Sequence, residues 1–134
     1  MREYFAFAGR LQRRGFVLFY GLPYLVVGAL PGLLLPHGPL QVTLESLVVL
    51  VVLPGIARRL HDVGIGLWIF LVVEAVYFGV LGLQTTGVLG EWRQLVILLA
   101  SAPSLLIILA LFFIPGTKDS NRFGAPVGSD QQAA

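Results

Sequence analysis

The sequence contains little charge and no cysteine, and each of these absences excludes classes of protein. Only 12% of the 134 residues are charged, against about 25% in a soluble domain, and the mean hydropathy is +0.87. So few charged side chains cannot cover a water-facing surface, which excludes an ordinary soluble globule and a disordered chain. The lack of cysteine excludes disulfides, thiolate metal sites and a cysteine nucleophile. What remains is a membrane protein.

Four long apolar runs occupy most of the chain. They cover approximately residues 16–35, 40–57, 66–83 and 95–114, and a helix needs roughly 20 such residues to cross a bilayer. Backbone amides in lipid must find partners within their own segment, so the runs predict helices in spite of their Val, Ile and Phe content. The predicted fold class is therefore all-α. We expect one integral membrane domain over residues 1–134, a bundle of four transmembrane helices with a polar tail at 125–134.

Basic residues gather on one side of these predicted spans. Eight of the nine Lys and Arg residues flank the chain termini or lie between the second and third spans, whereas Arg93 lies in one of the other two connections. The excess of basic residues in cytoplasmic loops of membrane proteins then places both termini and the middle connection in the cytoplasm.

Polar residues form three clusters on this predicted cytoplasmic side, at residues 4–16, 53–68 and 115–126. Guanidinium groups, a histidine that titrates near neutral pH, and Asp and Asn side chains suit a phosphate or carboxylate ligand. The same groups could instead form a structural network that holds the loops. The candidate residues of this polar cap are Arg10, Arg13, Arg58, Arg59, His61, Asp62, Asn121 and Arg122.

Two acidic residues, Glu45 and Glu74, lie inside the second and third predicted spans. An ionisable residue at membrane depth predicts a proton relay or a cation path. The alternative is a protonated glutamate that packs in a helix interface. Its hydrogen-bond partner would then be Ser46, Tyr24, Ser101 or Ser104.

The three polar clusters resemble the bacterial membrane family called Domain of Unknown Function 805. The sequence FAFAGRLQRRGF precedes the first span, LPGIARRLHDVGIGLW joins the second and third, and PGTKDSNRFGAP follows the fourth, in the order typical of that family. Ile65 and Leu67 depart from it, since the family more often has polar or small residues there. The resemblance implies a multi-pass protein of the bacterial inner membrane with a shared cytoplasmic site. Because the family has no established activity, it implies no reaction.

Three classes of function remain open. The leading interpretation is a sensor or accessory subunit that binds an anionic lipid headgroup or another phosphate-bearing ligand at the polar cap. The alternative is an oligomeric transporter, channel or lipid-translocating subunit that uses Glu74 and Glu45, as a homo-oligomer or with a membrane protein partner. A membrane enzyme that acts on a lipid phosphate through His61 is the third. No enzyme motif occurs, and we predict no cofactor, no metal and no nucleic-acid partner.

Overall fold

The computed structural model describes residues 7–30, 34, 39–84 and 86–126. These residues form helices and turns, with one isolated β-bridge between Asn121 and Gly124 and no strand. The all-α prediction is therefore confirmed for this part of the chain. Parts of the predicted first span (31–33 and 35) and most of the predicted polar tail (127–134) lie outside the described residues.

Four helical stretches correspond to the four predicted spans. The N-terminal helix begins as α1 (Arg13–Phe16) and continues through the π-helical segments η1 (Val17–Gly21) and η2 (Tyr24–Ala29). It is followed by α3 (Pro39–Val63), α4 (Trp68–Gln84), the short 3₁₀ helix η3 (Gly90–Trp92) and α5 (Arg93–Phe113).

The π-helical segments lie on either side of Pro23. Proline has no amide hydrogen and its ring clashes with the carbonyl four residues earlier, so a regular α-helical ladder cannot continue through it. Wider i to i+5 turns accommodate such an interruption without ending the helix. The first predicted span is thus helical over its described part, in a form that the apolar pattern did not indicate.

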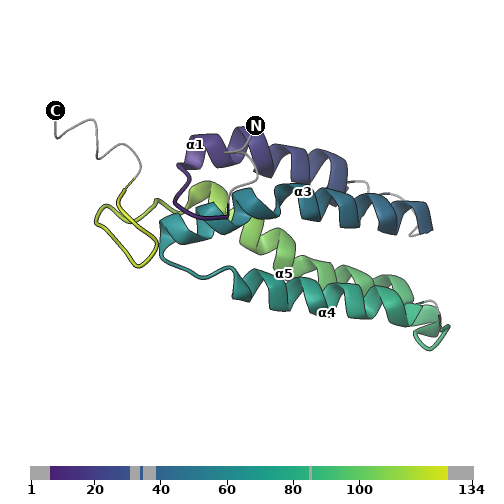
Figure 1. Ribbon diagram of the computed structural model, residues 1–134. Coiled ribbons are helices and arrows are strands. Elements are labelled where there is room, and N and C mark those ends of the chain that lie inside the picture. Colours follow the sequence, from purple (N-terminus) through teal and green to yellow (C-terminus); the bar gives the residue numbers. More distant parts are fainter. Residues whose placement is uncertain (1–6, 31–33, 35–38, 85, 127–134) are drawn as a thin grey trace.

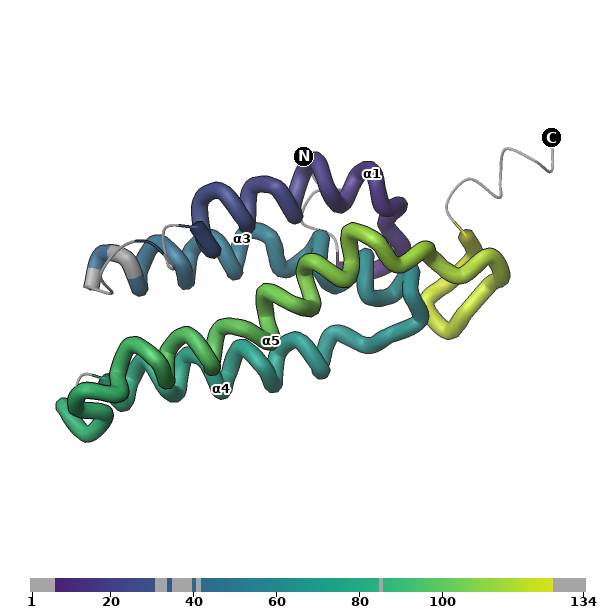
Figure 2. Tube along the Cα trace, turned by 180° about the vertical axis from the view of Figure 1, so that it is seen from behind, coloured from purple at the N-terminus to yellow at the C-terminus, as the bar shows by residue number. Residues whose placement is uncertain are grey.

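The helices are arranged as two hairpins (Figure 1). The N-terminal helix packs along α3, and α4 packs along α5. The hairpins meet where α1, the end of α3 and the end of α5 come together, and they separate toward the opposite end (Figure 2). We call the end that also carries residues 115–126 the cap end. The larger apolar core lies between the hairpins and includes Phe16, Ile56, Phe70 and Ile108.

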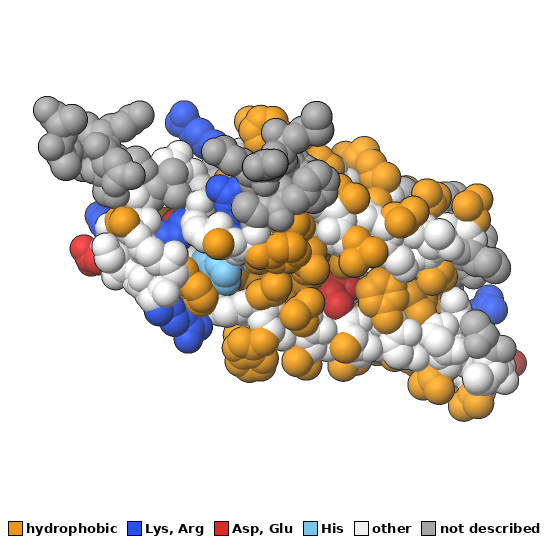
Figure 3. Space-filling view, in the orientation of Figure 1, with side chains coloured by type: hydrophobic (Ala, Val, Ile, Leu, Met, Phe, Trp, Pro, Cys, Tyr) orange, Lys and Arg blue, Asp and Glu red, His pale blue; other side chains and the backbone are white. Residues whose placement is uncertain are grey.

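Hydrophobic side chains cover much of the face of both hairpins that Figure 3 shows. Leu50 of α3, Val72 of α4 and Leu99 of α5 are among many large hydrophobic side chains exposed along the body of the molecule. Within the described residues, Gly90–Phe113 is the one helix that is both long and apolar enough to cross a membrane, and α4 is a shorter apolar helix of 17 residues. The structure therefore indicates a membrane protein through α5.

Candidate functional site

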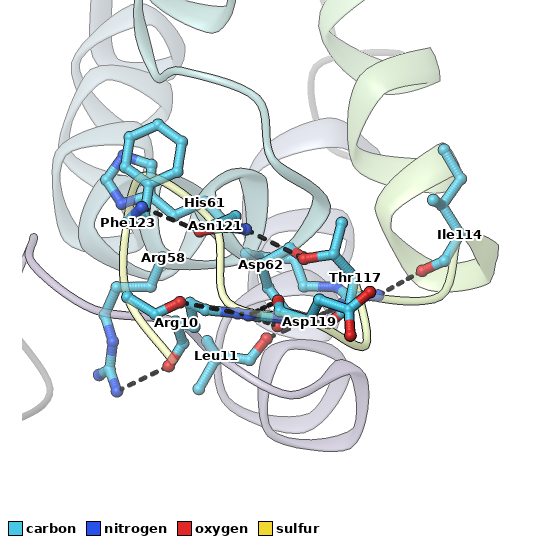
Figure 4. A network of polar contacts seen from close by, with 12 residues as sticks. Arg10, Leu11, Arg58, His61, Asp62, Ile114, Thr117, Asp119, Asn121 and Phe123 are labelled. Atoms are coloured by element: carbon cyan, nitrogen blue, oxygen red, sulfur yellow. Dashed lines mark hydrogen bonds and ion pairs between the residues drawn. The ribbon is translucent and has the colours of Figure 1, made fainter. Parts of the chain in front are cut away.

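The polar cap forms where four segments far apart in sequence meet (Figure 4). They are the chain around Arg10, the last turns of α3, the end of α5 and the loop that follows it. Helix α3 continues to Val63, beyond the predicted end of the span at residue 57, so the RRLHD run lies on a helix. Its side chains are thereby held in fixed directions at the cap end.

Asp62 is the centre of the polar cap and binds two arginines. Arg10 Nε donates to Asp62 Oδ1 at 2.9 Å, and Arg59 Nη1 donates to Asp62 Oδ2. Arg59 is completely buried, and Arg10 and Asp62 are each only 6% exposed. One carboxylate therefore pairs with two buried guanidinium groups, which leaves a net charge of +1, and we call these three residues the buried triad.

The remaining donors of the triad arginines bind backbone carbonyls. Arg10 donates to the carbonyl oxygens of Thr117, Asp119 and Gly124. Arg59 donates to those of Leu111, Ile114 and Leu11. Each planar guanidinium thus connects segments that are distant in sequence, as its fork of donors allows. The triad arginines are engaged with the protein itself.

Hydrogen bonds to backbone carbonyls attach the loop after α5 to the end of α3. Thr117 N donates to the Asp62 carbonyl at 2.8 Å, and Asn121 Nδ2 donates to the His61 carbonyl at 2.9 Å. Gly116 allows the close approach, because a Cβ atom at this position would overlap the Asp62 carboxylate. The conformation of this loop therefore depends on the same residues that form the triad.

His61 lies beside the triad in a stack of planar groups. Its ring packs on Phe123 with centroids 3.8 Å apart and planes at 10°, and the Arg122 guanidinium lies 4.7 Å from the centroid of the same phenyl ring. Burial lowers the pKa of His61, a hydrogen bond with the Gly9 backbone raises it, and the nearby Arg122 charge lowers it further. The net effect is a lowered pKa, which favours a neutral imidazole at neutral pH.

The eight predicted cap residues all lie at the cap end, but they do not form one cluster of equivalent cations. Arg10, Arg59 and Asp62 are buried together, whereas Arg13 and Arg122 are exposed and Arg58 is half-buried. Arg13 Nη1 approaches the Phe113 carbonyl at 3.4 Å, and Arg58 Nη2 approaches the Arg10 carbonyl at 3.5 Å. We call the cations around the triad the basic rim: Arg13, Arg14, Arg58, Lys118 and Arg122.

A second polar region lies between the two hairpins, away from the polar cap. It is a cavity of about 50 Å³ lined by both buried acids, Glu45 of α3 and Glu74 of α4. Tyr77 Oη donates to Glu45 Oε2 at 2.5 Å and so joins α4 to α3. The other lining residues are Tyr24, Gly28, Ala29, Val49, Tyr77, Ser101, Ser104 and Leu105.

Three of the four partners that the sequence offers for the acids line this cavity, namely Tyr24, Ser101 and Ser104. Ser46 instead donates to the Val42 carbonyl of its own helix. Two contributors were not identified from the sequence, Tyr77 and Thr117. Tyr77 follows Glu74 by three residues, so helical periodicity places both on one face and could have indicated it. No comparable signal marks Thr117.

Comparison with known proteins identifies a family. The family model described as "Protein of unknown function (DUF805)" matches residues 4–125. No curated protein and no solved structure matches the chain.

Proposed function

The chain belongs to the DUF805 family of proteins of unknown function, and on this premise we propose that its basic rim binds an anionic, phosphate-bearing ligand. In this proposal the protein is a multi-pass protein of the bacterial inner membrane with both termini in the cytoplasm. It acts as a sensor or accessory subunit, and the buried triad is the scaffold that holds the rim.

The length of α4 and the positions of two tryptophans support a membrane crossing by each helix of the α4–α5 hairpin, two of the four proposed crossings. The 17 residues of α4 extend about 25 Å at 1.5 Å per residue, close to the thickness of a bilayer core. Trp68 begins α4 at the cap end, Trp92 precedes α5 at the opposite end, and both are exposed. Tryptophans at the two ends of an apolar hairpin are typical of the two membrane interfaces.

The observation that carries the ligand proposal is the division of cations at the cap end. The triad arginines are buried and bound to Asp62 and to carbonyls, whereas Arg13, Arg14, Lys118 and Arg122 are exposed. Figure 3 shows this concentration of basic side chains at one end of the molecule. A basic side chain next to an anionic lipid surface contributes about 1 kcal/mol, so the rim favours phosphate-bearing headgroups.

Lipid retention by the purified protein tests this proposal. The protein in neutral detergent is mixed with phosphatidylglycerol, phosphatidylcholine or inorganic phosphate, and bound molecules are quantified by native mass spectrometry. The variant R13Q/R122Q removes two rim charges, and R93Q removes one basic residue at the opposite end as a matched control.

We expect wild type and R93Q to retain phosphatidylglycerol over phosphatidylcholine, and R13Q/R122Q to lose roughly 30-fold in affinity, the equivalent of about 2 kcal/mol. Binding of inorganic phosphate without lipid selectivity would identify a free phosphate compound as the ligand. Equal retention of both lipids together with no phosphate binding would contradict the proposal.

The acidic cavity favours a second candidate function, an oligomeric transporter or channel that uses Glu74 and Glu45. The cavity is lined by residues of both hairpins. Four helices leave little room for a path, so a second copy or a protein partner would complete it. Ion flux into proteoliposomes tests this candidate. Flux that is present in wild type and lost in E74Q supports it, and equal flux in both contradicts it.

A further inference from the structure

We propose that the cavity between the hairpins is a binding site for one small monovalent cation. This inference rests on the second candidate function, because it concerns the same cavity, and it specifies which kind of ion that function would carry. Binding at equilibrium does not require transport, however, so the two can be tested separately.

The polar side chains that line the cavity carry oxygen atoms only. Carboxyl groups come from Glu45 and Glu74, and hydroxyl groups come from two tyrosines and two serines: Tyr24, Tyr77, Ser101 and Ser104. No nitrogen or sulfur side chain lines it, and no group of three His, Cys, Asp or Glu residues in the described part of the chain could hold a metal ion. All-oxygen surroundings suit hard cations rather than transition metals.

Two buried polar atoms in the cavity have no hydrogen-bond partner among the described residues. They are Glu74 Oε1 and Ser104 Oγ, in side chains on neighbouring helices that are 6% and 2% exposed as residues. Ser104 lies near enough to act as a hydrogen-bond donor to Glu74, but neither Glu74 Oε1 nor Ser104 Oγ has a partner with full hydrogen-bond geometry. Buried polar groups in native proteins nearly always have a partner, so two unpaired oxygens in one cavity indicate a site for something that binds them.

The charge of the cavity favours a cation. Glu45 and Glu74 are close enough to interact, and no lysine or arginine lines the cavity to balance them. Two carboxylates that line one cavity repel each other when both are ionised, and a cation between them reduces that repulsion. Glu45 already accepts the Tyr77 hydroxyl, so Glu74 is the acid with coordination capacity to spare.

The size of the cavity favours a monovalent ion. A volume of about 50 Å³ accommodates roughly three or four water molecules, or one cation with one or two waters. Mg²⁺ keeps several waters and gives them up reluctantly, and Ca²⁺ takes six to eight oxygen ligands. A small monovalent cation needs fewer ligands. Glu45 can therefore keep the hydrogen bond from Tyr77 while the ion is bound.

Thermal unfolding of the intact protein in neutral detergent tests the site. The pH and the ionic strength are held constant while choline chloride is replaced by LiCl, NaCl or KCl. Because a ligand that binds only the folded state stabilises it, we expect at least one of these ions to raise Tm by roughly 4 °C or more at saturation. Calorimetric titration of the same sample with that salt should show one site per chain.

Three variants distinguish this site from a general salt effect. E74Q keeps the size of the side chain but should abolish the ion-dependent rise, and S104A, a milder change, should weaken ion affinity several-fold. E91Q removes an exposed acid on η3 and should behave as wild type.

The site is refuted if choline stabilises the protein as well as the alkali ions do, if only Ca²⁺ or Mg²⁺ does so, or if E74Q retains the rise. Ion-dependent Tm without flux would contradict transport while leaving the site in place. Flux without any ion-dependent Tm would contradict the site.

Discussion

The substitution D62N should destabilise the protein severely, because it leaves two buried arginines without a counter-ion. Asparagine has nearly the size of aspartate and can still accept one hydrogen bond, so the packing changes little. What disappears is the single carboxylate that contacts both Arg10 and Arg59. In the described part of the chain, no other carboxylate forms an ion pair with either of them.

The expected loss is about 3–5 kcal/mol in the free energy of unfolding, the usual cost of removing one partner from a buried ion pair. Two features of the site change the size of this loss in opposite directions. The carbonyl groups that accept from Arg10 and Arg59 remain and partly solvate the charges. The two guanidinium groups, however, repel each other once the carboxylate between them is gone. Whole domains are stable by only about 5–15 kcal/mol, so the loss should be large.

Unfolding in mixed micelles, followed by far-UV circular dichroism, measures this change. D119N is the matched control, because the Asp119 side chain is exposed and only its carbonyl contacts Arg10; its effect should stay within about 0.5 kcal/mol. The double variant R10Q/D62N should recover part of the loss, since it removes one uncompensated charge. A D62N protein within about 1 kcal/mol of wild type would refute the argument.

Three further changes test other parts of the structure by the same unfolding measurement. Y77F removes the hydrogen bond to Glu45 between α4 and α3 and should cost about 1–3 kcal/mol, because it leaves a buried carboxyl oxygen without its donor; no loss would contradict that contact. G116A should destabilise because its Cβ would overlap Asp62, whereas G79A, with open space around it, should not; equal effects would contradict the close packing. The lowered pKa of His61 means that the unfolded chain binds its proton first, so stability should fall as the pH drops below about 6.5. H61N should show a smaller fall over that range, and identical pH profiles would exclude His61 as a cause.

Much of the helical architecture follows from composition. Long apolar runs with almost no charge predict helices, because in lipid an isolated segment can satisfy its backbone only within itself. The position of the basic residues predicts which ends of the helices lie together. The separation of the two hairpins away from the cap end does not follow from the runs, since it depends on how side chains of different helices pack.

The site, like the fold, was predictable from the sequence only in part. The RRLHD run and its two companion clusters identified the residues of the polar cap, but not which of them bind each other. Arg58 and Arg59 are adjacent in sequence, yet one is half-buried and the other is wholly enclosed. Successive residues on a helix point about 100° apart, so the direction in which α3 meets its neighbours decides which arginine reaches Asp62.

The sequence by itself determined that this chain is helical, apolar on its outside and basic at one end, because the solvent constrains composition before any tertiary contact forms. Only the tertiary structure decided that Arg10 and Arg59 share one carboxylate, and that Glu45 and Glu74 face one cavity. Arg10 and Asp62 are 52 residues apart, and Tyr77 and Glu45 are 32 apart. Pairs at such separations are brought together by the packing of whole helices, and that packing depends on side-chain shape, which no local pattern in the sequence records.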